Sequence, residues 1–193
     1  MTASAHCQDR LPPLRQDQFT AAQRTAAELA AAGPREGVIG PLVALLRSPE
    51  LMTRVRGVGG YFLWGETALP DDVRELTILI VARQWTQQYE WTYHRGIAER
   101  VGVPAAVCAD LAEGRRPEPL VGQLLAAYDL VTELLRQHAV SDRSYQRALA
   151  QFGEAGVVEL TTLAGYYTTL AMIMNMAGTP VPEGAGERLR SIP

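Results

Sequence analysis

The feature that most constrains the fold of this chain is a long apolar stripe near its carboxyl end. Apolar residues recur there at steps of three and four, at Leu160, Leu163, Tyr167, Leu170 and Met174. This period places them on one face of an α-helix. No segment shows the strict alternation of apolar and polar residues that predicts a half-buried strand. The sequence therefore predicts an all-α fold.

Glycine, proline and capping residues predict where the helices begin and end. Ser48-Pro49-Glu50 is typical of an N-cap followed by a first-turn proline and an acidic first turn. The apolar segment 76–82 predicts a central helix that is covered on several sides. The expected helices cover residues 19–32, 41–47, 49 to about 60, 71–85, a segment ending at Gly102, 104–113, 120–139, 141–153, and the long stripe around 160–174. Residues 1 to about 17 and the last ten are expected to be tails.

Composition narrows the function classes. The 193 residues carry a formal net charge of −3, so no basic footprint indicates a nucleic acid or an anionic membrane as partner. We expect no membrane span, because no apolar run approaches about 20 residues, and no secretion signal. The two cysteines, Cys7 and Cys108, form no CxxC or metal-ligand spacing. These features predict a cytoplasmic protein without disulfides.

Glu90 and His94 are the first candidate site residues. They are four residues apart, and Ile97 and Val101 continue the same helix face. A carboxylate and an imidazole on an inward face are costly unless they are paired or used. A solvated surface pair is the alternative, but the aliphatic residues on this face favour a functional pair that titrates as a unit and transfers a proton.

Other titratable residues have plainer interpretations. Asp72 and Glu75 match a capping box at the start of the 71–85 helix, so local sequence favours a capping role for Glu75. Asp129 and Glu133, one turn apart, are most simply a solvated acidic face. Cys108 lies between Val107 and Ala109 and is expected to be a small buried group.

Several motifs together resemble the carboxymuconolactone decarboxylase family, which belongs to the alkyl hydroperoxidase D-like proteins. The motifs are Gly40-Pro41-Leu42, Leu45-Leu46-Arg47-Ser48-Pro49-Glu50-Leu51, Leu69-Pro70, Arg74-Glu75-Leu76, Ile78-Leu79, Tyr89-Glu90-Trp91 with His94, Glu159-Leu160, and Gly165-Tyr166-Tyr167. The resemblance spans about residues 37–183. It implies an N-terminal extension at 1–36 (a tail plus a helix), a helical domain at 37–183 and a tail at 184–193.

The resemblance also implies a fold built around a helical hairpin, assembled as a homotrimer or homohexamer. One branch of this group uses a CxxCxxxH motif with a relay glutamate upstream. Aligned on His94, its cysteine positions fall at Gln87 and Glu90, and its relay glutamate falls at Glu75. Without a thiolate, thiol peroxidase activity is not expected. The alignment also moves Glu75 from a capping role to the pocket.

The function implied by the resemblance is that of a cofactor-independent lyase that moves protons on a small organic acid, lactone or related carbonyl compound. His94 would donate the proton, Glu90 would tune and orient His94, and Glu75 would relay protons or position the substrate. Gln87, Tyr89 and Trp91 would shape the substrate pocket.

Related reactions remain open, namely dehydration, isomerisation and ring opening. So does a non-catalytic oligomeric binding protein in which Glu90 and His94 form a structural pair. A metal site made of Glu75, Glu90 and His94 is a weaker alternative, because the chain offers no second histidine nearby.

Overall fold

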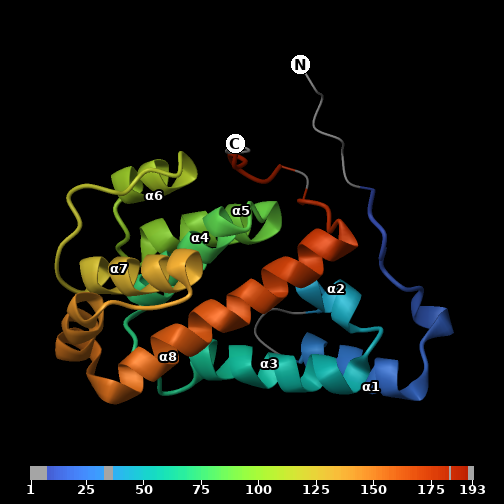
Figure 1. Cartoon of the computed structure of the whole chain (residues 1–193). Helices are drawn as coiled ribbons and strands as arrows, with labels where there is room; N and C mark the ends of the chain where they lie inside the picture. The colour runs from blue at the N-terminus through green and yellow to red at the C-terminus, as the bar shows by residue number, and fades with distance from the viewer. Residues whose placement is uncertain (1–7, 33–36, 183, 191–193) are drawn as a thin grey trace.

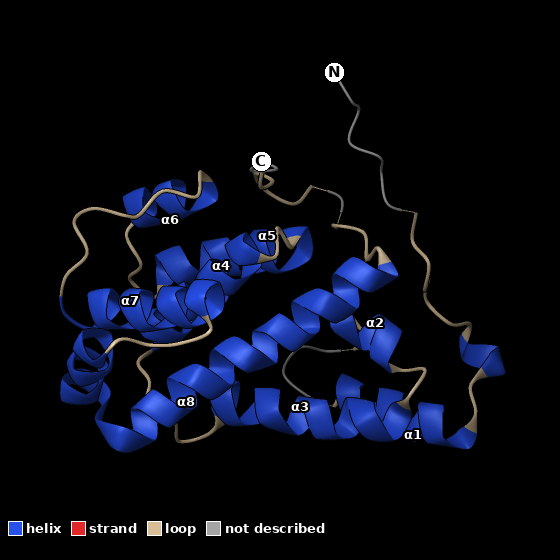
Figure 2. Cartoon of the chain, in the orientation of Figure 1, coloured by secondary structure: helices blue, strands red, loops and turns tan. Residues whose placement is uncertain are grey.

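A computed structural model of the chain describes residues 8–32, 37–182 and 184–190. Within these ranges the chain forms eight α-helices and one short 3-10 helix, and no strand, which confirms the all-α prediction (Figures 1 and 2). The helices are α1 (Ala21–Ala31), α2 (Pro41–Leu45), α3 (Pro49–Trp64), α4 (Asp71–Gln84), α5 (Gln88–Arg100), α6 (Ala105–Ala112), α7 (Gly122–Gln137) and α8 (Asp142–Ala177). The 3-10 helix is Gln16–Gln18.

Helix α4 is the centre of the fold. It packs against α5, α6, α7 and α8, and every residue from Leu76 to Arg83 is buried. This matches the expectation from the apolar segment 76–82. Because α4 is covered on several sides, a polar side chain on its inner faces must find its partner inside the protein.

Helix α8 crosses the molecule beside α4 and α7 (Figure 1). The five stripe residues are all buried, with 4% or less of each exposed. The helix end expected at Gly153 is a sharp change of direction within α8, since Gly153 has φ 66° and ψ 179°. Among the described helices, α8 alone is long and apolar enough to cross a membrane by length and composition. The core helix of a soluble protein passes the same test.

The N-terminal region joins the helical body. Helix α1 packs on α3, and its Ala26 and Ala30 belong to the main hydrophobic cluster. Residues 1–7 of the expected tail, and 33–36 at the expected domain boundary, lie outside the described residues. The N-terminal extension therefore contributes side chains to the hydrophobic core.

The C-terminal segment is also attached to the body. The Gln88 side chain accepts a hydrogen bond from the backbone N–H of Leu189 (2.9 Å) and donates one to its carbonyl (2.8 Å). Leu189 is buried, and the Arg83 guanidinium donates to the Arg190 carbonyl (2.8 Å). The segment expected to be a tail therefore lies against α4 and α5 through residue 190.

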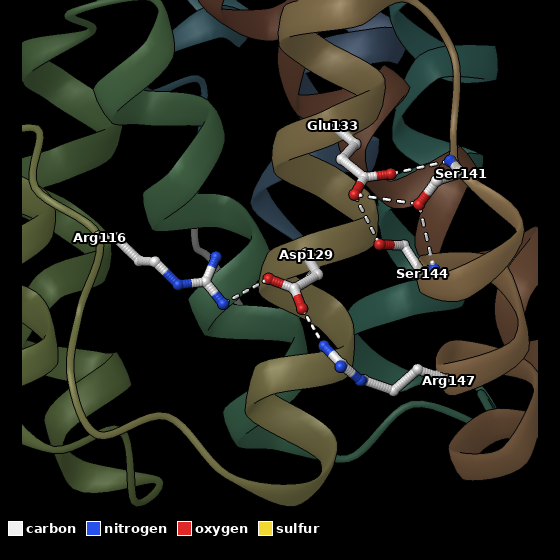
Figure 3. Close-up of polar contacts among 6 residues, drawn as sticks. All are labelled: Arg116, Asp129, Glu133, Ser141, Ser144 and Arg147. Atoms are coloured by element: carbon white, nitrogen blue, oxygen red, sulfur yellow. Dashed lines mark hydrogen bonds and ion pairs between the residues drawn. The ribbon is translucent and has the colours of Figure 1, made fainter.

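The prediction of a solvated face for Asp129 and Glu133 is wrong. Figure 3 shows both carboxylates joining α7 to neighbouring segments. Asp129 binds Arg116 (2.7 Å) and Arg147, which belongs to α8. Glu133 accepts hydrogen bonds from the Ser141 N–H (2.8 Å) and the Ser144 hydroxyl (2.7 Å), and these bonds lower the pKa of its carboxyl. The i, i+4 spacing of Asp129 and Glu133 could not reveal these partners, because all of them lie outside α7.

Candidate functional site

The site begins at the hairpin formed by α4 and α5. Residues 85–87 connect the two helices, with Thr86 at φ 47° and Gln87 as the N-cap of α5. The Gln87 side chain accepts a hydrogen bond from the backbone N–H of Glu90 (2.9 Å). This short connection brings the inner face of α5 against α4, which is where Glu75 and His94 meet.

Glu75 and His94 form a buried pair across the hairpin. Nδ1 of His94 lies 2.8 Å from Oε2 of Glu75, and the two residues are 2% and 7% exposed, respectively. The His94 ring also makes edge contacts with the rings of Tyr93 and Tyr167, at centroid distances of 5.1 and 5.3 Å. Partners on three sides fix the orientation of the imidazole.

The capping role that local sequence favoured for Glu75 is wrong. Helix α4 begins at Asp71 with Pro70 as its N-cap and no side-chain cap. Asp72 bonds the N–H of its neighbour Val73 (2.8 Å) instead. Glu75 is directed inward and bonds His94. It does not itself line the pocket that Glu90 and His94 share, so the pocket position that the family resemblance implied is reached only through His94.

Glu90 is a buried carboxyl without a partner. It is 3% exposed, and neither of its oxygens makes a hydrogen bond with any described residue. Burial raises the pKa of the Glu90 carboxyl to about 9, because desolvation disfavours the charged form. At neutral pH it is therefore a protonated acid. It does not bond His94, so the expected orienting role belongs to Glu75.

Glu90 and His94 line one pocket, whose cavity has a volume of about 80 Å³. Its walls come from α3, α5 and α8, and it is closed by one residue of α1, by the segment leading into α2 and by the start of α2. The lining residues are Ala30, Gly37, Ile39, Pro41, Leu42, Arg56, Gly59, Gly60, Leu63, Trp64, Tyr89, Glu90, Tyr93, His94, Tyr166, Tyr167, Leu170 and Met174. Most are apolar or aromatic, as in typical small-molecule sites.

Two glycines allow tyrosines to reach this pocket. A Cβ at Gly59 on α3 would lie 2.4 Å from the Tyr166 hydroxyl oxygen, and a Cβ at Gly40 would lie 2.7 Å from the Tyr89 ring. Gly40 also has φ 53°, which L side chains rarely adopt. Helix α3, which the sequence predicts to end near residue 60, continues through Gly59 and Gly60 to Trp64.

Of the three expected pocket-shaping residues, only Tyr89 lines the pocket. Gln87 caps α5 and bonds Asn175 (3.3 Å). Trp91 is fully buried in the core and does not line the pocket. Arg83 on α4 donates to the carbonyls of Ala112 and Arg190 and does not line the pocket. Gln87 and Trp91 are close to Glu90 in sequence, but near neighbours on a helix point to different faces, so this closeness did not place them in the pocket.

Arg56 is a lining residue that the sequence analysis missed. It lies on α3 together with Gly59, Gly60 and Leu63, at the i, i+3, i+4, i+7 spacing of one helix face. That spacing is visible in the sequence, but the two glycines hide it because they carry no hydrophobic side chain. The signal in the sequence is this one-face spacing, which begins at Arg56 and passes through the two glycines.

Metal and thiol chemistry have little support in the described part of the chain. There, no group of three or more His, Cys, Asp or Glu side chains is arranged to hold a metal ion. Cys108 is buried, as expected, and burial raises the pKa of its thiol to about 11, which makes it a poor nucleophile. Cys7 lies outside the described residues.

Comparison of the chain with protein-family models, curated proteins and solved structures finds no match. The family resemblance noted from the sequence motifs therefore stays an expectation.

Proposed function

We propose that this protein is a proton-transfer enzyme of the lyase type that acts on a small organic acid, lactone or related carbonyl compound. The observation that carries the proposal is the protonated, unpartnered carboxyl of Glu90, placed in the same apolar pocket as the oriented imidazole of His94. A carboxyl group whose pKa is strongly shifted inside a pocket is typical of functional sites.

Glu90 is the proton donor in this proposal. In a decarboxylation, the carbon–carbon bond to the carboxylate breaks, CO2 leaves, and its electron pair passes into a conjugated carbonyl. A protein acid must then protonate carbon. Glu90 carries a proton at neutral pH and has no internal acceptor in the described residues that competes for it.

His94 then takes up a proton from water at its free ring nitrogen and passes it to the Glu90 carboxylate, which restores the acid for the next turnover. Its Nδ1 is occupied by Glu75, so Nε2 is the nitrogen left for a substrate. A carboxylate that holds the other ring nitrogen fixes the tautomer and orientation of an imidazole. Glu75 is thus a positioning residue, and dehydration, isomerisation or ring opening would use the same three groups.

The test is turnover of a panel of β-keto acids, unsaturated lactones and enones in D2O, followed by proton NMR. Loss of substrate, or deuterium incorporation next to the carbonyl, reports proton transfer at carbon. Glu90→Gln keeps the size of the side chain and should lower the rate about 10²–10⁴-fold, the usual contribution of a general acid. Glu99→Gln, on the exposed side of α5, is the matched control and should keep the wild-type rate.

Wild-type turnover in Glu90→Gln would contradict the assigned role. Binding of panel members without any conversion would favour the alternative of a non-catalytic binding protein. The expected oligomer, homotrimer or homohexamer, and the cytoplasmic location are part of the proposal and are not needed for this test.

A further inference from the structure

Arg56 is the charged group of the pocket that the proposed function leaves without a role. It is half-buried on α3 and lines the pocket, yet it forms no hydrogen bond or ion pair among the described residues. Arg54, two residues earlier on the same helix, is exposed and bonds Glu50 (2.8 Å). A guanidinium that faces an apolar wall without a carboxylate is suited to bind an anion from outside.

The other groups of the pocket do not neutralise Arg56. The described lining residues include one carboxyl group, that of Glu90. Its pKa of about 9 keeps it uncharged at neutral pH. A bound anion would strengthen this, because a nearby negative charge disfavours ionisation of a carboxyl. The pocket therefore carries a positive potential that attracts anions.

The rest of the wall has a different chemistry. Along α3, Leu63 and Trp64 continue the lining face after Arg56. The seven residue steps from Arg56 to Leu63 span about 10 Å of helix, which is the length of a ring with a short side group. Ile39 and Leu42 face the same space. One end of the wall is cationic and the remainder is apolar.

We propose that the pocket takes a carboxylic acid with a single negative charge and an apolar, ring-sized body, and that Arg56 binds its carboxylate. This inference rests on the proposed function and narrows its substrate class. A second carboxylate on the ligand would have to lie against apolar or aromatic side chains, which is unfavourable without a second cation. Because the wall offers one cation and is otherwise apolar, we expect the pocket to bind monoanions more tightly than dianions.

The experiment is isothermal titration calorimetry at pH 7 and low salt, with phenylacetate as the probe. Phenylacetamide is its neutral counterpart, and phthalate supplies two negative charges on a similar ring. We expect the wild type to bind phenylacetate at least 10-fold more tightly than either compound. Arg56→Gln should weaken phenylacetate binding at least 10-fold and leave phenylacetamide unchanged, and Arg56→Lys should restore part of the loss. Arg54→Gln is the matched control and should bind phenylacetate like the wild type.

Three outcomes would overturn the inference: equal affinity of the wild type for phenylacetate and phenylacetamide, unchanged phenylacetate affinity in a folded Arg56→Gln, or no detectable binding of phenylacetate. Tighter binding of phthalate would overturn its single-charge part. Circular dichroism of each variant separates loss of binding from loss of fold. Because binding is measured without turnover, failure here leaves the role of Glu90 intact, and failure of the Glu90→Gln rate test leaves the role of Arg56 intact.

Discussion

The carboxyl group of Glu90 links the site to the pH dependence of stability. Its pKa in the folded protein is about 9, well above the ordinary value, so the folded chain holds a proton that the unfolded chain releases. The free energy of unfolding then falls as pH rises between about 4.5 and 9, by up to about 1.4 kcal/mol per pH unit from this group. Glu90→Gln cannot ionise and should flatten that slope, as measured by urea unfolding at pH 6, 7 and 8.

The matched control for this measurement is Glu99→Gln, which changes an exposed carboxyl on the same helix and should keep the wild-type slope. If the wild type and Glu90→Gln lose stability in parallel between pH 6 and 8, Glu90 is ionised in the folded protein. Its assignment as an acid at neutral pH would then be wrong.

At the scale of residues, sequence reasoning placed Glu90 and His94 on one inward helix face but predicted a contact between them that does not form. Glu90 and His94 were identified from one helix face, and a pair on one helix is the contact that local spacing can suggest. The actual partner of His94 is Glu75, 19 residues away on α4. The family resemblance placed Glu75 in the pocket, whereas local spacing favoured a cap. Contacts between helices depend on packing, which a single sequence does not show.

At the scale of elements, the contact between α3 and α8 depends on Gly59. A Cβ there would lie 2.4 Å from the Tyr166 hydroxyl oxygen, so Gly59→Ala must displace the tyrosine. We expect a loss of about 1 kcal/mol or more in the free energy of unfolding. Urea unfolding followed by far-UV circular dichroism measures it.

Gly57 on the same helix provides the comparison. A Cβ at Gly57 meets nothing within 4 Å, so Gly57→Ala should stabilise the protein by about 0.5–1 kcal/mol through helix propensity. Equal effects of the two substitutions would show that Tyr166 moves aside without cost.

Helix positions were the most predictable level of the structure. The period on α8 and the apolar surface of α4 each follow from residues within one helix, and both are buried as expected. The break at Gly153 was also visible, since glycine at the end of a periodic segment is a helix-stop signal. The links from Asp129 to Arg116 and Arg147 were not visible, because they join residues that only tertiary packing brings together.

At the scale of the whole molecule, exposed apolar side chains bear on the expected oligomer. Large apolar residues are exposed on several helices, among them Val58, Tyr61 and Trp64 of α3 and Val158, Met172 and Met176 of α8. Such surfaces are often covered by another chain. The family resemblance implies a homotrimer or homohexamer, so light scattering should give about three or six times the 21.1 kDa mass of the chain. A monomer across micromolar concentrations would contradict it.

Part of the pocket wall comes from α1 and the segment before α2. This origin affects how the ligand selectivity of such a protein can change. Ala30, Gly37 and Ile39 touch the ligand space, while Glu90 and His94 come from α5, some fifty residues later in the chain. Substitutions in the first forty residues can therefore reshape what enters the pocket without altering the groups that handle the proton. Exchanging that segment between related chains would be a direct way to change selectivity while keeping one reaction.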